Sequence, residues 1–588
     1  MSENIDVIDA YHNPVLNPTT IHSFRWTRVH AALAALTAIF INAIYFFRLD
    51  QVVGQFGDDA WYIVLARSIA EQGTYQLISS PIQGIHPSYP PGLPLLYAIV
   101  LKIFSLKSQE FWLLKGVSIA AMNMIGLGTF IYCRKVKEFP VLISWLTTLM
   151  VVLMPAYVFL ATSTLMSECV FTCFQFWAVV HLENAIKSKE VKISTIVTVI
   201  GLASASFYTR SLGMTLVAAI VIQLFRNTNW QRTAFFVLGV GLLISPWIIY
   251  SKIAYPNQEL RLKHGGNIVH SYVDQVTMRI AGFNGSGKAT TEDYAKRING
   301  NLQTILGKDV LGIMLPSTLR TETRSGEEVF GLGSGIVDVY KKIPFAQQAI
   351  VVSLILSLVM LIGFIAQCRE QITSAEILIF LTVGCIVIWP WSTFRFILPL
   401  SPFMICYWIM GLKIASSWVM QRVKNDFDGF MFVRISLFCF SFFFLLEHVR
   451  YINLLRTNPQ SIVWVESGRY QDKLCTWIRE NLPTDSVVAS TNPAKIFLST
   501  GHLAVAGDLS EQSWSYWKDS KVNYMAILSP NPKGMLDRTP EKYQTIYDSG
   551  TEPSLRVINL GDPIKRDSWS EYQDALFQYY LQQTEPNK

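Results

Sequence analysis

Apolar runs of membrane-spanning length recur along this 588-residue chain. A helix needs about 20 apolar residues to cross the hydrocarbon core of a bilayer. Hydrophobic residues make up 51% of the sequence and charged residues only 15%, which excludes an ordinary soluble globular protein of this size. The runs lie near residues 29–47, 112–132, 141–160, 169–186, 193–209, 211–225, 233–251, 346–366, 375–391, 396–418 and 430–449. The sequence therefore predicts a polytopic α-helical membrane protein with about 11 transmembrane helices.

The N-terminal segment, residues 1–28, is polar and ends in Arg25 and Arg28. The first apolar run follows it, and Arg48-Leu49-Asp50 stands where a small-residue cleavage site would be needed. We therefore expect residues 1–28 on the cytoplasmic side and a retained signal anchor.

One further apolar run, Leu93–Phe104, is short and carries Pro94 and Lys102. A re-entrant or interfacial helix suits that length better than a span. With this choice the basic clusters all fall in inner loops, at residues 134–137, 187–192, 226–232, 369–373 and 421–428. Counting the run as a span would instead place the cluster at 134–137 outside, against the positive-inside rule.

This topology places three segments on the outer side of a plasma or bacterial inner membrane. Two are loops of the membrane domain 29–449, at residues 48–110 and 251–345, and the third is a soluble extracytoplasmic α/β domain over 450–588. Periodicity and breakers in that domain predict helices at Tyr470–Asn481 and Ala494–Thr500 and strands at Ser486–Ser490, Tyr524–Leu528 and Leu555–Leu560.

Two adjacent acids, Asp58 and Asp59, stand just after the first span and open a predicted amphipathic helix, Asp59–Gln72. Either carboxylate is suited to cap the helix, and Gly73 is suited to end it. We expect this helix to lie along the membrane surface. Taken alone, the acidic pair indicates no more than a helix cap.

Ionisable residues at membrane level are costly and are therefore functional candidates. Glu168 is the only charge in its outer loop, and Arg210 and Arg395 are lone outer arginines. Snorkelling to the interface would explain either arginine taken alone, but the positive-inside rule disfavours both positions. Acids and arginines on one membrane face are typical of a site that activates a nucleophile and holds a phosphate.

The stretch from His86 to Pro94 contains four prolines and should stiffen the chain where it re-enters the membrane. A rigid turn explains these residues without any chemistry. His86 is a candidate for contacting substrate or metal, although a lone histidine more often serves as a structural hydrogen-bonding group.

Three other features do not support a function. The net charge of +7 does not imply nucleic acid, because the basic residues form short clusters between apolar runs. The eight cysteines suggest no disulfide framework, and packing explains Cys169 and Cys173 better than a metal. The stretch Gly282–Ala289 has phosphate-loop spacing but lacks the final Ser or Thr and a preceding strand, so it is interpreted as a turn.

The order of these features resembles the GT-C superfamily of membrane glycosyltransferases. It is most similar to the branch that contains protein O-mannosyltransferases, the lipid A aminoarabinose transferase and related bacterial transferases. The resemblance covers about residues 29–450 and rests on the order of its motifs, since no single motif is diagnostic. The matching residues are Asp58, Asp59, Tyr62, Ala66, Gly73, Tyr89–Pro94, Glu168, Ser245-Pro246-Trp247 and Arg395. Asp59 departs from the pattern, because relatives often have Glu there, which leaves open which carboxylate is the base.

The resemblance implies transfer of a sugar from a polyprenyl phosphate to a lipid, glycan or protein acceptor in the cell envelope. Asp58 would be the general base, with Asp59 and Glu168 as further catalytic acids. Arg395 and Arg210 would stabilise the phosphate left on the lipid. Tyr62, His86 and Tyr89 would contact substrate. Relatives differ in metal use, so a divalent cation held by Asp58, Asp59, Glu168 and His86 stays open.

Two other classes compete with this interpretation. A multi-pass transporter or flippase of lipid-linked or small polar substrates would also explain many spans with buried charges, although transporters often show two repeated halves. A non-catalytic assembly or adhesion protein would make Asp58 dispensable. Cleavage of a polyprenyl-phosphate sugar by the purified protein would separate both from an enzyme.

Overall fold

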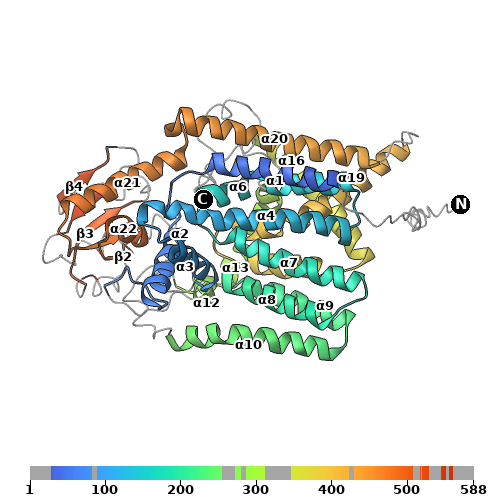
Figure 1. Cartoon of the computed structure of the whole chain (residues 1–588), viewed down its shortest axis with the longest axis horizontal. Helices are drawn as coiled ribbons and strands as arrows, with labels where there is room; N and C mark the ends of the chain where they lie inside the picture. The colour runs from blue at the N-terminus through green and yellow to red at the C-terminus, as the bar shows by residue number, and fades with distance from the viewer. Residues whose placement is uncertain are drawn as a thin grey trace.

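The computed structural model of the chain describes residues 28–81, 89–254, 272–279, 287–310, 346–422, 429–507, 517, 520–528, 544–550 and 555–560. Long helices run side by side through most of the molecule, and a small sheet with two helices lies beyond one end of them (Figure 1). The structure therefore has the two parts that the sequence predicts, a helical bundle and a C-terminal α/β region.

Within the described residues, seven helical stretches are long and apolar enough to cross a membrane. They contain α1 (Arg28–Arg48), α4 (Lys115–Ile131), α7 (Glu168–Lys187), α10 (Trp230–Ala254), α16 (Ala346–Glu370), α19 (Ser401–Arg422) and α20 (Gly429–Thr457). These helices make the chain a multi-pass integral membrane protein.

The other four predicted runs are also helical but are shorter or bent. Helices α5 (Val141–Val152) and α6 (Pro155–Ser163) meet at an angle of 47°. The remaining three are α8 (Ile193–Thr209), α9 (Gly213–Asn227) and α17 (Ser374–Val387). Each of the eleven apolar runs thus contains a helix, but the number of crossings stays a prediction. The short run 93–104 forms the 13-residue helix α3 (Gly92–Phe104).

Short helical segments connect the long ones. They are η3 (Ser68–Gln72), η4 (Ser108–Leu114), η5 (Tyr132–Val136), α12 (Tyr272–Thr277), α13 (Thr291–Thr304), η8 (Ile305–Asp309), α18 (Phe394–Ile397), η11 (Leu398–Leu400) and η12 (Pro459–Ser461).

Helices α16 and α19 cross at two glycines. A Cβ atom on Gly363 would lie 1.9 Å from the Tyr407 carbonyl oxygen, and one on Gly411 would lie 1.8 Å from that of Val359. Backbones can approach this closely only where both residues lack a side chain, which is how membrane helices gain packing without a hydrophobic driving force. The two glycines therefore fix the crossing of α16 and α19.

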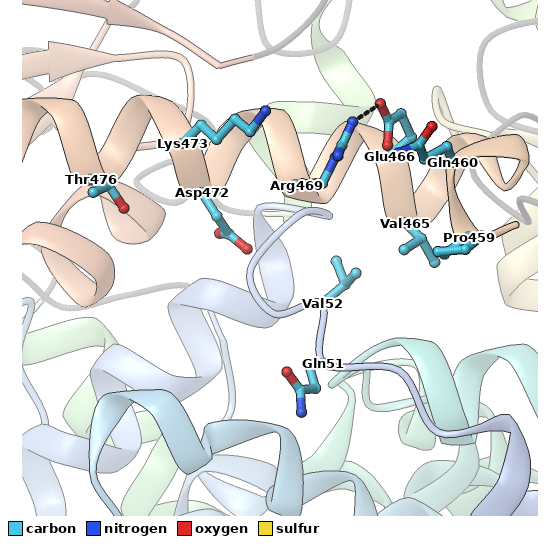
Figure 2. Close-up of a pocket in the computed structure, with 10 residues that line it drawn as sticks. All are labelled: Gln51, Val52, Pro459, Gln460, Val465, Glu466, Arg469, Asp472, Lys473 and Thr476. Atoms are coloured by element: carbon cyan, nitrogen blue, oxygen red, sulfur yellow. Dashed lines mark hydrogen bonds and ion pairs between the residues drawn. The ribbon is translucent and has the colours of Figure 1, made fainter. Parts of the chain in front are cut away.

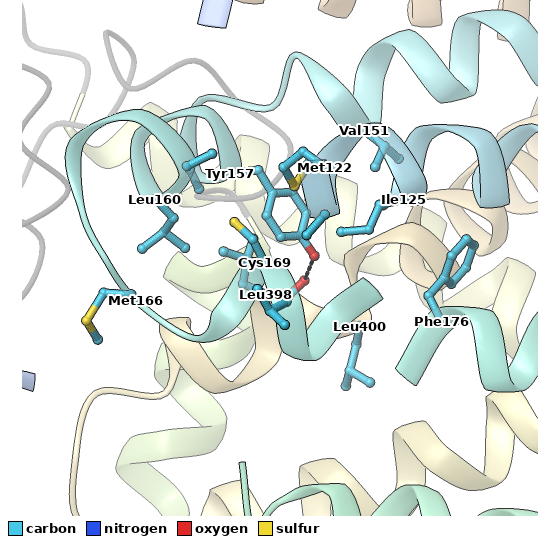
Figure 3. Packing of buried hydrophobic residues seen from close by; sticks show 14 of the residues in the cluster. Met122, Ile125, Val151, Tyr157, Leu160, Met166, Cys169, Phe176, Leu398 and Leu400 are labelled. Atoms are coloured by element: carbon cyan, nitrogen blue, oxygen red, sulfur yellow. Dashed lines mark hydrogen bonds between the residues drawn. The ribbon is translucent and has the colours of Figure 1, made fainter. Parts of the chain in front are cut away.

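Tyr157 joins three helical segments in the bundle core. Its hydroxyl donates to the Leu398 carbonyl oxygen at 2.9 Å and lies 3.3 Å from Thr172 Oγ1. Figure 3 shows Tyr157 among Met122, Cys169 and Leu398. Since Leu398 begins η11, three residues after Arg395, this contact anchors the chain that carries Arg395.

The C-terminal sheet has five strands in the order β2-β1-β3-β5-β4. The strands are β1 (Val487–Ser490), β2 (Ala504–Ala506), β3 (Val522–Ile527), β4 (Gln544–Asp548) and β5 (Arg556–Asn559). β1 pairs in parallel with β2 and β3, whereas β5 pairs antiparallel with β3 and β4. Helices α21 (Val463–Asn481) and α22 (Pro493–Thr500) accompany them. The sequence predicted β1, β3, β5 and both helices but missed the two edge strands.

The predicted helix 59–72 forms as α2 (Asp58–Arg67) followed by one π-helical segment, η3. It ends, as predicted, at Gly73, which adopts the left-handed conformation with φ of +68°. Ala60 and the run from Tyr62 to Ala66 are buried, while the expected place of this helix along the membrane surface stays a prediction. Helix α2 packs between α3 and α22 and is therefore part of the protein interior.

Candidate active site

The side chain of Asp58 lies at the start of α2, after Gly57 turns the chain with φ of +82°. One carboxylate oxygen, Oδ1, accepts a 2.7 Å hydrogen bond from the Tyr89 hydroxyl. The other, Oδ2, lies 3.2 Å from Arg395 Nη2. The helix has no side-chain cap, so Asp58 is not the N-cap that its position suggested. Its side chain is 36% exposed and so is open to a ligand.

Asp59 points the other way, into the protein, and is fully buried. Its Oδ2 accepts a 3.1 Å hydrogen bond from the Gly54 amide, and its Oδ1 accepts one of 3.0 Å from the Ala60 amide. Burial raises the pKa of Asp59 to about 6, although the positive charge of Lys495 opposes the rise. The two adjacent acids therefore have separate environments, one open and one structural.

Glu168 opens α7 and is also fully buried. Its Oε1 lies 2.7 Å from Arg210 Nη1 and accepts a 2.8 Å hydrogen bond from Arg395 Nε. A carboxylate at a helix N-terminus is favoured by the helix dipole. One buried acid thus holds both of the predicted phosphate-binding arginines.

Aromatic rings flank the two guanidinium groups. Arg210, at the C-terminal end of α8, lies over the Phe396 ring at 4.8 Å, and Arg395 lies over the Phe56 ring at 5.3 Å. Stacking of this kind orients an arginine while leaving its edge free to donate. Both guanidinium planes are therefore fixed before any ligand arrives.

Two tyrosines, Tyr62 and Tyr89, lie on one side of the Asp58 carboxylate. Tyr62 is buried, packs its ring against that of Tyr89 with the centroids 5.1 Å apart, and donates to Ser167 Oγ at 3.2 Å. Burial raises the pKa of both phenols well above the ordinary value, so both stay protonated. His86, the third residue expected to contact substrate, lies outside the described residues.

Gly92 allows the segment that carries Tyr89 to approach the segment that carries Arg210. A Cβ atom there would lie 2.7 Å from the backbone carbonyl of Tyr208, two residues before Arg210. The missing side chain lets the start of α3 touch the end of α8. This contact gives a physical role to the glycine of the Pro90-Pro91-Gly92 stretch.

The charges of the site alternate in space as Asp58, Arg395, Glu168 and Arg210, and two acids balance two bases. An anion that entered beside Asp58 would meet Arg395, whose side chain is 21% exposed. Among the described residues, no three His, Cys, Asp or Glu side chains are grouped to hold a metal ion. The arrangement can remove a proton through Asp58 and stabilise negative charge through the guanidinium groups.

Four residues near this group were missed by sequence reasoning. Ser167 lies between Tyr62 and Arg210, while Phe56 and Phe396 stack on the arginines. Lys495 acts on Asp59 from the C-terminal region. No local pattern marks a serine, a phenylalanine or a lysine for such contacts. The stretch 282–289, which has phosphate-loop spacing, falls mostly outside the described residues. Within it, Lys288 pairs with Met278 in an isolated bridge.

No protein-family model and no curated protein matches the chain. The fold does match solved structures. Apo ArnT from Cupriavidus metallidurans aligns with a TM-score of 0.55 and 11% identity over 90% of this chain and 98% of that one. The same protein bound to undecaprenyl phosphate has a TM-score of 0.46, 12% identity and coverage of 91% and 98%. The oligosaccharyltransferase AglB from Archaeoglobus fulgidus, in complex with an inhibitory peptide and a dolichol-phosphate, has a TM-score of 0.46, 10% identity and coverage of 85% and 70%. The likeness to apo ArnT shows that the fold is GT-C-like, as the sequence predicted.

Proposed function

We propose that this chain is a membrane glycosyltransferase that moves a sugar from a polyprenyl-phosphate donor to an acceptor on the outer face of the membrane. The observation that carries the proposal is the grouping of Asp58, Arg395, Glu168 and Arg210, which come from four separate segments. The GT-C-like fold supports the same reaction class. The sugar and the acceptor are left unspecified.

Asp58 is the proposed general base. The acceptor hydroxyl gives its proton to Asp58 while its oxygen forms a bond to the anomeric carbon. The bond between that carbon and the phosphate oxygen breaks, and its electron pair stays on the phosphate. The lipid phosphate therefore changes from a diester to a monoester and gains negative charge. A single displacement of this kind inverts the anomeric centre.

Arg395 is the proposed partner of the departing phosphate. In the structure it is already neutralised on one side by Asp58, at 3.2 Å, and on the other by buried Glu168, at 2.8 Å. A phosphate bound at Arg395 would compete with the exposed Asp58 more readily than with Glu168. Binding of the donor would then release Asp58 to act as a base.

Glu168 and Arg210 have supporting roles in this scheme. Because Glu168 is fully buried and bonded to both arginines, we assign it to positioning rather than to proton transfer. Arg210 adds a second positive charge that opposes the negative charge of Glu168. Without Arg210, the carboxylate would weaken the pull of Arg395 on a phosphate. Tyr89 would orient the carboxylate of Asp58, and Tyr62 would support Tyr89 by packing against its ring.

Purified protein in lipid nanodiscs should consume a polyprenyl-phosphate sugar from a panel of labelled hexose and pentose donors and release polyprenyl phosphate. The control is Asp58→Asn prepared in the same way. Movement of an intact donor across a vesicle membrane, with no cleavage by either protein, would favour the transporter interpretation instead. Lack of both activities over the whole panel would leave the proposal without support and favour an assembly role.

A further inference from the structure

The C-terminal region forms hydrogen bonds with the loop that leads into the candidate active site. Asn492 Nδ2 donates to the Gly54 carbonyl oxygen at 2.7 Å, and Lys495 Nζ donates to that of Val53 at 2.7 Å. Both side chains are almost completely buried. Gly54 is four residues before Asp58, and its own amide donates to Asp59. These contacts therefore fix the carbonyl groups of Val53 and Gly54, in the loop that leads to the turn at Gly57.

The fit at Gly54 is close. With φ of +76°, Gly54 adopts a backbone conformation that side chains disfavour, and a Cβ atom there would lie 3.0 Å from Lys495 Cδ. The loop therefore needs glycine both for its conformation and to let Lys495 pass. Lys495 Nζ also lies 2.7 Å from Asp472 Oδ1 of α21, which aims the ammonium group.

Helix α21 holds the same loop from a second side. A Cβ atom on Gly468 would lie 2.9 Å from Val52 Cγ1, so the helix and the loop are in direct contact there. Next to this contact, a cavity of about 530 Å³ is lined by Gln51, Val52, Arg469, Asp472 and Lys473 among others. Figure 2 shows Asp472 on the side of α21 that faces Val52. The ring of Trp464 in α21 packs against that of Phe56 with the centroids 5.3 Å apart, and the guanidinium group of Arg395 lies over the Phe56 ring.

We infer that Asn492 and Lys495 are positioning residues of the C-terminal region, which hold residues 53–57 so that Asp58 meets Arg395 in the geometry needed for reaction. The inference rests on the proposed function and extends it, because it gives the C-terminal region a part in the chemistry. Neither residue touches the substrate. Misplacing a catalytic group by about 1 Å can lower a rate about 100-fold.

Two substitutions separate this role from simple folding. Asn492 has two duties: its Oδ1 caps α22 by accepting from the Lys495 amide, and its Nδ2 holds Gly54. Serine is an equally good N-cap but is too short to reach Gly54, so Asn492→Ser keeps the helix and removes the loop contact. Lys495→Met keeps the length of the side chain and removes its charge. Lys473→Met is the matched control, because Lys473 is an exposed lysine on α21 that makes neither loop contact.

The first measurement is hydrogen exchange of the full-length protein in detergent, followed by mass spectrometry, and it requires no activity. We expect faster exchange in peptides that cover residues 51–61 in both variants, with unchanged exchange in α16 and α19. The control variant should behave like the unaltered protein. Loss of protection throughout the chain in both variants would mean that these residues only maintain the fold, and it would overturn the inference.

The second measurement is transfer of the labelled sugar. We expect kcat to fall at least about tenfold in Asn492→Ser and Lys495→Met, with KM for the donor little changed. The ionised carboxylate of Asp59 also holds the Gly54 amide, and loss of the Lys495 charge raises the pKa of Asp59, so the acid limb of the pH profile should move to higher pH in Lys495→Met. The other groups acting on Asp59 are Asp58, Lys115 of α4 and Tyr97 of α3.

The outcomes distinguish the two proposals. If both variants keep the kcat and the pH profile of the unaltered protein, the positioning role is overturned. The glycosyltransferase proposal would then stay intact. An unaltered protein that transfers no sugar would count against the proposed function alone, since the exchange experiment would still report whether Asn492 and Lys495 hold the loop.

Discussion

Arg395 and Asp58, separated by 337 residues in the sequence, meet with their side-chain atoms 3.2 Å apart. The same guanidinium group donates from Nε to buried Glu168, so the arginine bridges an open acid and a closed one. Solvent reaches Asp58, whose side chain is 36% exposed, but does not reach Glu168, which is fully buried. The Asp58 contact is therefore easy to exchange for a ligand, whereas the Glu168 contact is not.

Asp58→Asn should abolish transfer and leave the protein folded. An amide has nearly the size of the carboxylate and can still accept from the Tyr89 hydroxyl, but it cannot take a proton at neutral pH. Loss of a general base typically costs 10²- to 10⁴-fold in rate. The measurement is kcat together with the thermal midpoint. Glu71→Gln is the control, since Glu71 is an exposed acid in η3, directly after α2, and pairs with Arg67. A variant with near-normal turnover would remove Asp58 from the mechanism and make Asp59 the candidate base.

Asp59→Asn should change how stability depends on pH. The pKa of Asp59 is raised from 3.8 to about 6 on folding, chiefly by burial, so the folded protein binds this proton more tightly than the unfolded chain. The contribution of Asp59 to the free energy of unfolding is then fully present below pH 3.8 and is lost as the pH rises to about 6. The loss has an upper bound of about 3 kcal/mol. The thermal midpoint of Asp59→Asn relative to the unaltered protein should therefore rise between pH 4 and pH 7. A constant difference would show that Asp59 does not titrate in this range.

The sequence located most candidate residues but could not give their pairing. Charges that are rare at membrane level, such as Glu168, Arg210 and Arg395, stand out by local composition alone. Which carboxylate each arginine meets depends on helix packing between distant segments, and no periodicity encodes it. The contact of Asn492 with Gly54 spans 438 residues and was invisible for the same reason.

Local signals also decided which elements were predicted. Gly73 ends its helix because a left-handed residue is needed there, and Pro483 and Gly501 bound two helices of the C-terminal region. The missed strands β2 and β4 lie at the edges of the sheet. β2 has only three residues, and β4 has no buried residue, so no apolar face marks it in the sequence. Helix α2 is more buried than its amphipathic pattern indicates, because α22, which lies more than 400 residues further along the chain, packs against it.

Gly411→Ala should destabilise the bundle strongly for so small a change. The new methyl group would meet the Val359 carbonyl oxygen at 1.8 Å, so α16 and α19 would have to separate. Overpacking of this kind typically costs 1–3 kcal/mol or more. The measurement is the thermal midpoint in detergent.

Gly384→Ala is the matched control for that prediction. Gly384 lies in α17, where an added Cβ atom meets nothing within 4 Å. Alanine favours a helix over glycine by about 0.5–1 kcal/mol, so this change should be neutral or stabilising. If both variants unfold at the same temperature, the close crossing of α16 and α19 is not a source of stability.

Reporter fusions should place Phe104 outside and Lys137 inside. The expectation rests on the basic cluster at residues 134–137 and on the 13-residue length of α3, which is short for a span. At each position, one reporter that is active only outside the membrane and one that is active only in the cytoplasm would be fused. Their activities would show on which side of the membrane that position lies. Opposite readings would mean that α3 crosses the membrane and that the topology after it is inverted.

Arg395→Ala should weaken both the binding of polyprenyl phosphate and the rate of transfer. A phosphate that gains charge during the reaction interacts more strongly with a fixed guanidinium group in the transition state than in the ground state, so the rate should fall more than the affinity. Lysine keeps the charge but cannot reproduce the planar fork that reaches Glu168 and a phosphate together. Arg395→Lys should therefore keep some binding and lose much of the rate. Free polyprenyl phosphate gives the sharper test, because as an inhibitor it presents only the group that Arg395 is proposed to hold. Arg422→Ala is the control, since Arg422 is an exposed arginine at the far end of α19 that stacks on Trp418. If Arg395→Ala is inhibited as strongly as the Arg422→Ala control, the arginine serves only to hold Asp58 and Glu168 in place.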